Sequence, residues 1–237
     1  MHRAFILFTL GLGLAACASD TGDESMFLSK NVAPGDGCIF TATATELFNP
    51  HGAYSLFARR GYDLFPQVVS TISATETTVE QRTIQIRGAR VDLAMADGSA
   101  VNAPTHFESL FAAPVPPNGG LADGAFELIP TSFAAAVAAA NNITPATTTV
   151  FKAEVVAKVV LFGDLTGTEV LSQEFQYPVT LCNDCVTNIV GTCPLPSTAV
   201  VTNVGNSCNP YQDGYVDCCS SGNNVICPAT IAPPPPP

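Results

Sequence analysis

The sequence predicts an all-β protein: an antiparallel β-sandwich with one short helix and a disulfide-rich, irregular C-terminal segment. Three observations predict it. Between residues 38 and 181 the apolar residues form short runs, often alternating with polar ones, and Gly, Pro, Asn or Asp separate the runs. Only one stretch, rich in alanine, favours a helix. Seven of the nine cysteines lie within residues 182–227.

Six segments between residues 38 and 130 are strand candidates. They read CIFTATATEL, GAYSLFARR, GYDLFPQVVSTI, RTIQIRGARVDLAM, HFESLFAAPV and GAFELIP. Their spacing favours a sandwich over alternating βαβ units. The clearest alternation places Ile84 and Ile86 on one face and Arg87 on the other, and Gly88 then permits a bulge or bend.

The strongest hairpin signal lies between residues 148 and 182. Two long β-branched runs flank residues 163–167, whose two glycines can adopt positive φ. We therefore expect a β-hairpin with its turn in this loop.

The helical stretch, PTSFAAAVAAANN, covers residues 130–142. Thr131 or Ser132 can cap its start, and the two asparagines that close the stretch can end it. We expect a short structural helix packed over one end of the sandwich.

The first residues have the order of an export signal. Arg3 precedes a short apolar run from residue 4 to 13, which is too short to span a bilayer of about 30 Å. The run ends in Leu14-Ala15-Ala16-Cys17, which resembles the lipobox of bacterial lipoproteins. The resemblance implies cleavage before Cys17, a diacylglycerol thioether on its sulfur and an acyl group on the new amine. The alternative is an ordinary secretory signal cut nearby, with Cys17 an incidental thiol.

Residues 17–37 are polar and acidic, which predicts a flexible tether between the anchor and the folded part. Ala18 follows the lipobox cysteine, where an aspartate would favour retention in the inner membrane. We therefore expect a lipid-anchored protein of the bacterial cell envelope that is delivered to the outer membrane.

The charge of the chain is strongly acidic. Residues 1–16 hold one arginine and no acid, so 8 basic and 20 acidic side chains remain after cleavage. Such a balance repels phosphate backbones, which excludes nucleic acid as a partner. The chain has no tryptophan, which weakens but does not remove a glycan-binding interpretation, because tyrosine can also stack on sugars.

Eight cysteines besides Cys17 predict four disulfides in an exported chain. They are Cys38, Cys182, Cys185, Cys193, Cys208, Cys218, Cys219 and Cys227. Residues 182–227 contain few large apolar side chains, so covalent cross-links would replace a core there. Cys38 must pair with one of the other seven, and a bond between the adjacent Cys218 and Cys219 would be strained. The remaining pairing stays open.

Zinc binding and redox catalysis are two other possible uses of these cysteines, and the sequence supports each of them less well than it supports disulfides. Cys182 and Cys185 have the spacing of a zinc knuckle, but residues 182–227 contain no histidine. A redox dithiol needs cations or a helix N-terminus beside it, whereas here Asp184 separates the two thiols. We therefore expect no metal and no cofactor.

Elements such as SQEFQYPVTLCNDC and CNPYQDGYVDCC resemble cysteine-rich envelope lipoproteins of Gram-negative bacteria. This resemblance implies a class and a location and no activity. The expected organisation is a signal peptide (1–16), a tether (17–37), a β-sandwich (38–181), a cysteine-rich segment (182–227) and a proline-rich tail (228–237) that acts as a spacer.

Candidate catalytic residues are few. His51 and His106 are the two histidines beyond the signal, and His106 lies near Glu108 and Ser109 without any nucleophile motif around it. We expect no catalytic site and a non-enzymatic binding or structural role, with an envelope protein or a glycan as the possible ligand. An envelope hydrolase that uses His106 is the alternative.

Two acidic pairs could attract calcium. They are Asp213 with Asp217 and Asp164 with Glu169, and neither has the order of an EF-hand. We expect turn and surface roles for these four carboxylates.

Overall fold

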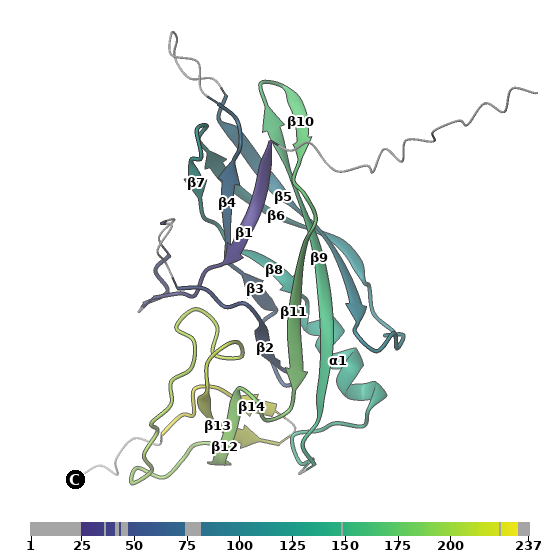
Figure 1. Cartoon of the computed structure of the whole chain (residues 1–237). Coiled ribbons are helices and arrows are strands. Elements are labelled where there is room, and N and C mark those ends of the chain that lie inside the picture. The colour runs from purple at the N-terminus through teal and green to yellow at the C-terminus, as the bar shows by residue number, and fades with distance from the viewer. Residues whose placement is uncertain are drawn as a thin grey trace, which may run out of the picture.

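The computed structural model describes residues 25–35, 37–40, 43, 47–73, 82–147, 149–222 and 224–231. The fold is all-β with a single helix in this part of the chain, as the sequence predicts (Figure 1). The expected signal peptide, Cys17 and the run of prolines after residue 231 lie outside the described residues.

The largest sheet has six strands. Its order is β2-β11-β9-β5-β6, and β10 pairs with β9 beyond the end of β11. The strands are β2 (Gly52–Ser55), β5 (Ile84–Met95), β6 (His106–Val115), β9 (Lys152–Leu165), β10 (Thr168–Leu171) and β11 (Phe175–Cys182). All pairs of this sheet are antiparallel except β2 with β11, which run parallel.

Two smaller sheets cover one face of the large sheet. One contains β1 (Met26–Asn31), β4 (Pro66–Ser70) and β7 (Leu121–Ala122), and the other contains β3 (Tyr62–Leu64) and β8 (Phe126–Ile129). Their inward side chains share one apolar core with those of the large sheet: Leu28, Val68 and Leu128 belong to the same buried cluster as Val91 and Val159. One layer of the sandwich is therefore formed by the two small sheets, and the other layer by the large sheet.

Strand β5 shows the alternation that the sequence predicts. Ile84 and Ile86 are buried and Arg87 is exposed. The register with both neighbouring strands shifts between Ile86 and Gly88, which confirms a bulge. A Cβ on Gly88 would lie 2.7 Å from the Ser109 carbonyl oxygen, so this close approach of β6 requires glycine.

The predicted hairpin is formed by β9 and β10. Leu165 pairs with Thr168, which leaves a two-residue turn at Thr166 and Gly167. Both turn residues have positive φ, 53° and 87°. This geometry matches the twist of the flanking strands.

Helix α1 (Thr131–Ala140) lies within the predicted range. It buries Phe133 and Val137 in the main core. The predicted side-chain cap at Thr131 or Ser132 is wrong: Pro130 occupies the N-cap position and no side-chain hydrogen bond caps the helix. Its C-cap is Asn141, as expected.

The predicted tether is wrong for residues 26–31, because these residues form β1. Met26 and Leu28 point into the core, and β1 pairs with β4. Polar neighbours on both sides hide this short alternation in the sequence. The ordered chain therefore begins before Cys38.

The C-terminal segment is less irregular than the sequence predicts. It contains a three-stranded sheet, β12-β13-β14, in which β12 and β13 are parallel. The strands are β12 (Thr187–Thr192), β13 (Val216–Ser221) and β14 (Asn224–Ile226). Val216, Cys218 and Val225 form its own small buried cluster. Figure 1 shows this segment at the opposite end of the molecule from the start of β1.

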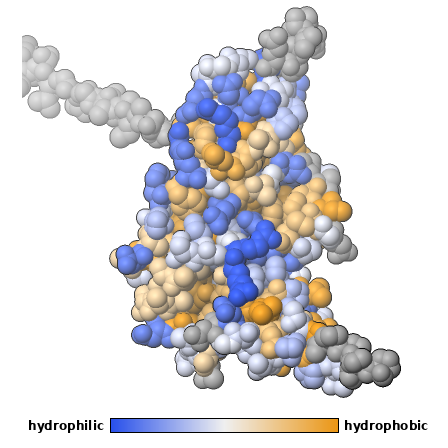
Figure 2. Space-filling view, turned by 180° about the vertical axis from the view of Figure 1, so that it is seen from behind, coloured by the Kyte–Doolittle hydropathy of each residue, from blue (hydrophilic) through white to orange (hydrophobic). Residues whose placement is uncertain are grey.

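No helix in the described part of the chain is long and apolar enough to span a membrane. Seen from behind, hydrophobic and hydrophilic residues are interspersed over the surface (Figure 2).

Candidate functional site

All eight cysteines of the folded part form disulfides, as predicted. The pairs are Cys38–Cys208, Cys182–Cys185, Cys193–Cys219 and Cys218–Cys227. Cys38 thus pairs with a cysteine of the C-terminal segment, and the adjacent Cys218 and Cys219 have separate partners. The Cys38–Cys208 bond joins positions 170 residues apart and ties the start of the sandwich to the C-terminal segment.

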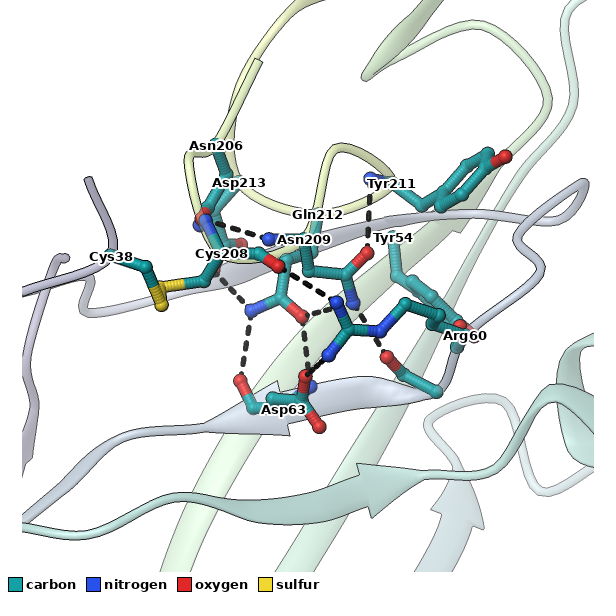
Figure 3. Close-up of polar contacts among 11 residues, drawn as sticks. Cys38, Tyr54, Arg60, Asp63, Asn206, Cys208, Asn209, Tyr211, Gln212 and Asp213 are labelled. Carbon is teal, nitrogen blue, oxygen red and sulfur yellow. Dashed lines mark hydrogen bonds and ion pairs between the residues drawn. A yellow bond between two sulfur atoms is a disulfide. The ribbon is translucent and has the colours of Figure 1, made fainter. Parts of the chain in front are cut away.

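Beside this disulfide, a buried amide pair holds the C-terminal segment against the sandwich (Figure 3). The Asn209 amide donates to the Gly61 carbonyl oxygen at 2.6 Å and to Gln212 Oε1 at 2.8 Å. Gln212 accepts from the Asp63 backbone N–H and donates to the Asp63 carbonyl oxygen, both at 2.8 Å. Both amide side chains are fully buried. The Gln212 side chain therefore bonds to the backbone N–H and carbonyl oxygen of Asp63 on β3, as the backbone of a neighbouring strand would.

Asp213 follows this pair and adopts a left-handed backbone, with φ of 54°. Its Oδ1 accepts from the Ala53 backbone N–H at 2.8 Å. Its Oδ2 accepts from the Tyr62 hydroxyl at 2.8 Å, from the Asn49 amide at 3.3 Å and from the Gln212 amide at 3.5 Å. Burial raises the pKa of this carboxyl, and the hydrogen bonds oppose that rise. Donors from residues 49–62, far from Asp213 in the sequence, thus converge on its carboxylate together with the amide of the preceding residue.

The network continues into the core through two tyrosines. The Tyr62 and Tyr177 hydroxyl oxygens are 3.2 Å apart, and the Asn31 amide donates to the Tyr177 hydroxyl at 2.7 Å. Burial raises the pKa of Tyr62 well above its usual value and that of Tyr177 to about 12. Both phenols therefore stay neutral and serve as hydrogen-bonding links between β1, β3 and β11.

A groove of about 530 Å³ opens beside this network. One wall consists of residues 33–35 with Asn49, and the other of residues 204–207, Pro210, Asp213 and Gly214, with Pro228 nearby. A hydrogen bond joins the two walls: the Ser207 hydroxyl donates to the Gly35 carbonyl oxygen at 2.9 Å. This volume lies in the range of small-molecule sites.

Asp217, paired with Asp213 in the sequence analysis, serves elsewhere. Its Oδ1 accepts from the amides of Asn188 and Asn203, and its Oδ2 accepts from the Thr202 hydroxyl and the backbone N–H groups of Thr202 and Asn203. The hydrogen bond from Asn188 contributes most to lowering the pKa of Asp217. The Asp217 carboxylate thus organises the loop that contains Thr202 and Asn203. Among the described residues it has no hydrogen-bond partner in common with Asp213.

The second acidic pair also has internal partners. Asp164 and Glu169 face each other across the β9–β10 hairpin. Asp164 accepts from the Gly167 backbone N–H, whereas Glu169 pairs with Arg87 at 2.7 Å and Arg90 at 3.3 Å. The described residues contain no cluster of three or more metal-ligating side chains.

His106 lies on the exposed edge strand β6. Its Nδ1 is 2.6 Å from Oδ1 of Asp92, its cross-strand neighbour. Because successive residues of a strand point to opposite faces, Ser109 points away from His106. Glu108 shares the face of His106 but pairs with Arg90 at 3.2 Å. The structure thus brings His106 to a carboxylate and not to a nucleophile.

His51 is exposed, and its Nε2 lies 3.4 Å from the Thr180 hydroxyl. The Cys182–Cys185 pair lies at the end of β11. Cys182 is buried, and its sulfur accepts from the Cys185 backbone N–H at 3.2 Å. In this oxidised state neither sulfur can ligate zinc, because both lack a thiolate.

Sequence reasoning named Asp213 as a possible calcium ligand but missed its neighbours Asn209 and Gln212. All three lie in the element CNPYQDGYVDCC, whose sequence shows their polar character but not their partners. Tyr62 and Tyr177 were missed as well, because they lie in segments that the sequence marks only as strands. The one signal was the combination of amide, tyrosine and aspartate residues between closely spaced cysteines.

No family model, no curated protein and no solved structure matches this chain.

Proposed function

We propose that the protein is a lipid-anchored component of the bacterial cell envelope with a non-enzymatic binding or structural role. The lipid is attached to Cys17, and delivery is to the outer membrane. The lipobox residues Leu14 to Cys17 support the anchor. An exported chain also agrees with the four disulfides, which persist in oxidising compartments.

The hydrogen-bonded junction between the C-terminal segment and the sandwich is the observation that supports a binding or structural role most directly. Burial raises the pKa of Asp213, a direction that catalytic acids often show. Both of its oxygens, however, accept hydrogen bonds from residues of the protein. A carboxylate bonded in this way to donors of the sandwich supports a structural role at the junction.

A hydrolase that uses His106 receives less support. The histidine side chain is 66% exposed, and its partner Asp92 is 58% exposed. Water screens such a pair strongly, and Ser109 is on the other face of the strand.

Labelling with a radioactive or clickable fatty acid tests the anchor in a bacterial host that has the lipoprotein-processing enzymes. We expect wild-type protein to incorporate the label and Cys17→Ser to lose it and remain uncleaved. Cys38→Ser is the matched control, because it removes another cysteine and leaves the lipobox intact. A Cys17→Ser protein with the mature mass of the wild type would contradict the lipobox assignment.

A further inference from the structure

A second groove, of about 430 Å³, lies where three segments of the chain meet. They are the loop that follows β2 (residues 56–59), the chain after α1 (residues 143–145) and the first part of β14 (residues 224–225). Its described lining residues differ from those of the groove beside Asp213. The volume lies in the range of small-molecule sites. We call it the Arg59 groove.

Backbone hydrogen bonds fix each wall of the Arg59 groove. The Leu56 N–H donates to the Cys182 carbonyl oxygen at 2.7 Å, and the Ile143 N–H donates to the Ala138 carbonyl oxygen at 2.9 Å. The third wall belongs to β14, which pairs with β13. Such a groove needs little rearrangement to receive a ligand, and preorganisation lowers the entropic cost of binding.

Most of the lining is apolar. Leu56 and Val225 are buried, and Phe57 packs against the small cluster that contains Val225. The other apolar lining residues are half-buried: Ala58, Ile143 and Pro145. A ligand that covers these side chains removes apolar surface from water, so an apolar body favours binding.

Arg59 is the one charged side chain among the described lining residues. It is exposed and has no ion-pair or hydrogen-bond partner in the described part of the chain. Arg60, Arg87 and Arg90 differ, because each of them pairs with an acidic side chain. The side chain of Asn224, which also lines the groove, likewise has no hydrogen-bond partner among the described residues. The groove therefore offers an uncompensated positive charge and a free amide.

The charge of Arg59 acts at the Val225 wall. The Tyr211 hydroxyl donates to the Val225 carbonyl oxygen at 3.5 Å. Burial raises the pKa of Tyr211, and the positive charge of Arg59 opposes that rise. An effect of this kind requires the guanidinium to lie near the phenol, and so near Val225.

We propose that the Arg59 groove binds a small monocarboxylate with an apolar body. A guanidinium can bind both oxygens of a carboxylate, and the Asn224 amide can donate a further hydrogen bond. One positive charge balances one negative charge, whereas a dianion would stay partly uncompensated in a chain whose net charge is already −11. The apolar walls then cover the rest of the ligand. The inference rests on the proposed binding role and not on the lipid anchor.

Isothermal titration calorimetry of the mature full-length protein in a nonionic detergent tests the proposal, with protein-free micelles as the blank. The probe is hexanoate. Hexanamide has the same body without the charge, acetate has the charge without the body, and sulfate is a dianion without an apolar body. We expect saturable binding of hexanoate, and binding at least about tenfold weaker for each of the three comparison probes.

Variants of Arg59 test the charge directly. Arg59→Gln should weaken hexanoate binding at least about tenfold and leave the weaker binding of hexanamide unchanged. Arg59→Lys keeps the charge and should retain part of the affinity for hexanoate. The matched control is Arg87→Gln, which removes the same charge beside β10, at the opposite end of the molecule from β14 (Figure 1). It should bind hexanoate like the wild type.

No saturable binding of hexanoate at concentrations up to about 20 mM would overturn the inference. So would equal affinity for any of the comparison probes, or binding of hexanoate that survives Arg59→Gln. The labelling of Cys17 tests the anchor separately, so an anchored protein that does not bind hexanoate refutes the groove inference alone.

Discussion

The Tyr62 hydroxyl donates a 2.8 Å hydrogen bond to Asp213 across 151 residues of sequence. Tyr62 lies on β3 and Asp213 in the C-terminal segment, so this bond joins the sandwich to the segment that the disulfides stabilise. Replacing Tyr62 with phenylalanine keeps the buried ring and removes the donor. We expect the free energy of unfolding to fall by about 1 to 3 kcal/mol, because a partly buried carboxylate loses a partner.

Urea unfolding measures this change, and Tyr211→Phe is the matched control. The Tyr211 hydroxyl makes only a 3.5 Å contact with the Val225 carbonyl oxygen, so its loss should cost less than about 1 kcal/mol. Equal losses of unfolding free energy in the two variants would mean that the hydrogen bond from Tyr62 to Asp213 adds no stability.

The Cys38–Cys208 disulfide should stabilise the fold more than Cys182–Cys185. Their sequence separations are 170 and 3, and the loop-entropy model assigns them about 5 and about 2 kcal/mol. The double variants Cys38→Ala/Cys208→Ala and Cys182→Ala/Cys185→Ala leave no odd thiol, so urea unfolding compares them directly. A larger loss for the Cys182/Cys185 variant would show that loop length does not govern these bonds.

The intact mass of the mature protein tests all four disulfides. It should increase by about eight hydrogens on full reduction, because each bond takes up two. In partly reduced protein, amide exchange should increase first within residues 182–227, where apolar contacts are few. Earlier exchange in β5 and β9 would contradict this order.

Asp217 should make stability depend on acid. Its folded pKa is lower than the unfolded value of 3.8, so its contribution is complete above that pH and is lost as pH falls toward the folded pKa. Asp217→Asn places an amide against the donors of Thr202 and Asn203, so it should be less stable than wild type at pH 7. Urea midpoints at pH 7 and about pH 3 should show this difference shrinking in acid. A difference that stays constant would contradict the pKa assignment.

The β9–β10 turn offers a stabilising substitution. Thr166 is β-branched and has a φ of 53°, a region that such residues rarely adopt. Thr166→Asn should raise the free energy of unfolding by about 0.5 to 1 kcal/mol, because asparagine tolerates this conformation at a two-residue turn. Thr168→Asn, in the adjacent strand, should give no such gain, and a thermal unfolding series with both variants checks the difference.

Local patterns predicted the local parts of this fold. The alternation around Ile84, the bulge at Gly88 and the turn near Gly167 each depend on residues that are adjacent in the sequence. Strand β1 was missed because only Met26 and Leu28 mark its inward face among polar neighbours.

The junction could not be predicted in the same way. Asn31 meets Tyr177 across 146 residues, and Gln212 meets Asp63 across 149. Tyrosine and asparagine in a strand do not show which partner they will find, because tertiary packing decides it. The cysteine pattern predicted that Cys38 bonds to the C-terminal segment. It did not predict which side chains surround that disulfide.

The early start of β1 limits how far the sandwich could lie from a membrane that held a lipid on Cys17. Met26 is nine residues from Cys17, and an extended chain of that length reaches at most about 32 Å. A lipid on Cys17 would therefore hold the β1 end of the sandwich close to the bilayer. The C-terminal sheet lies at the far end (Figure 1), so the cysteine-rich segment would form the outermost tip, facing whatever lies beyond the membrane surface.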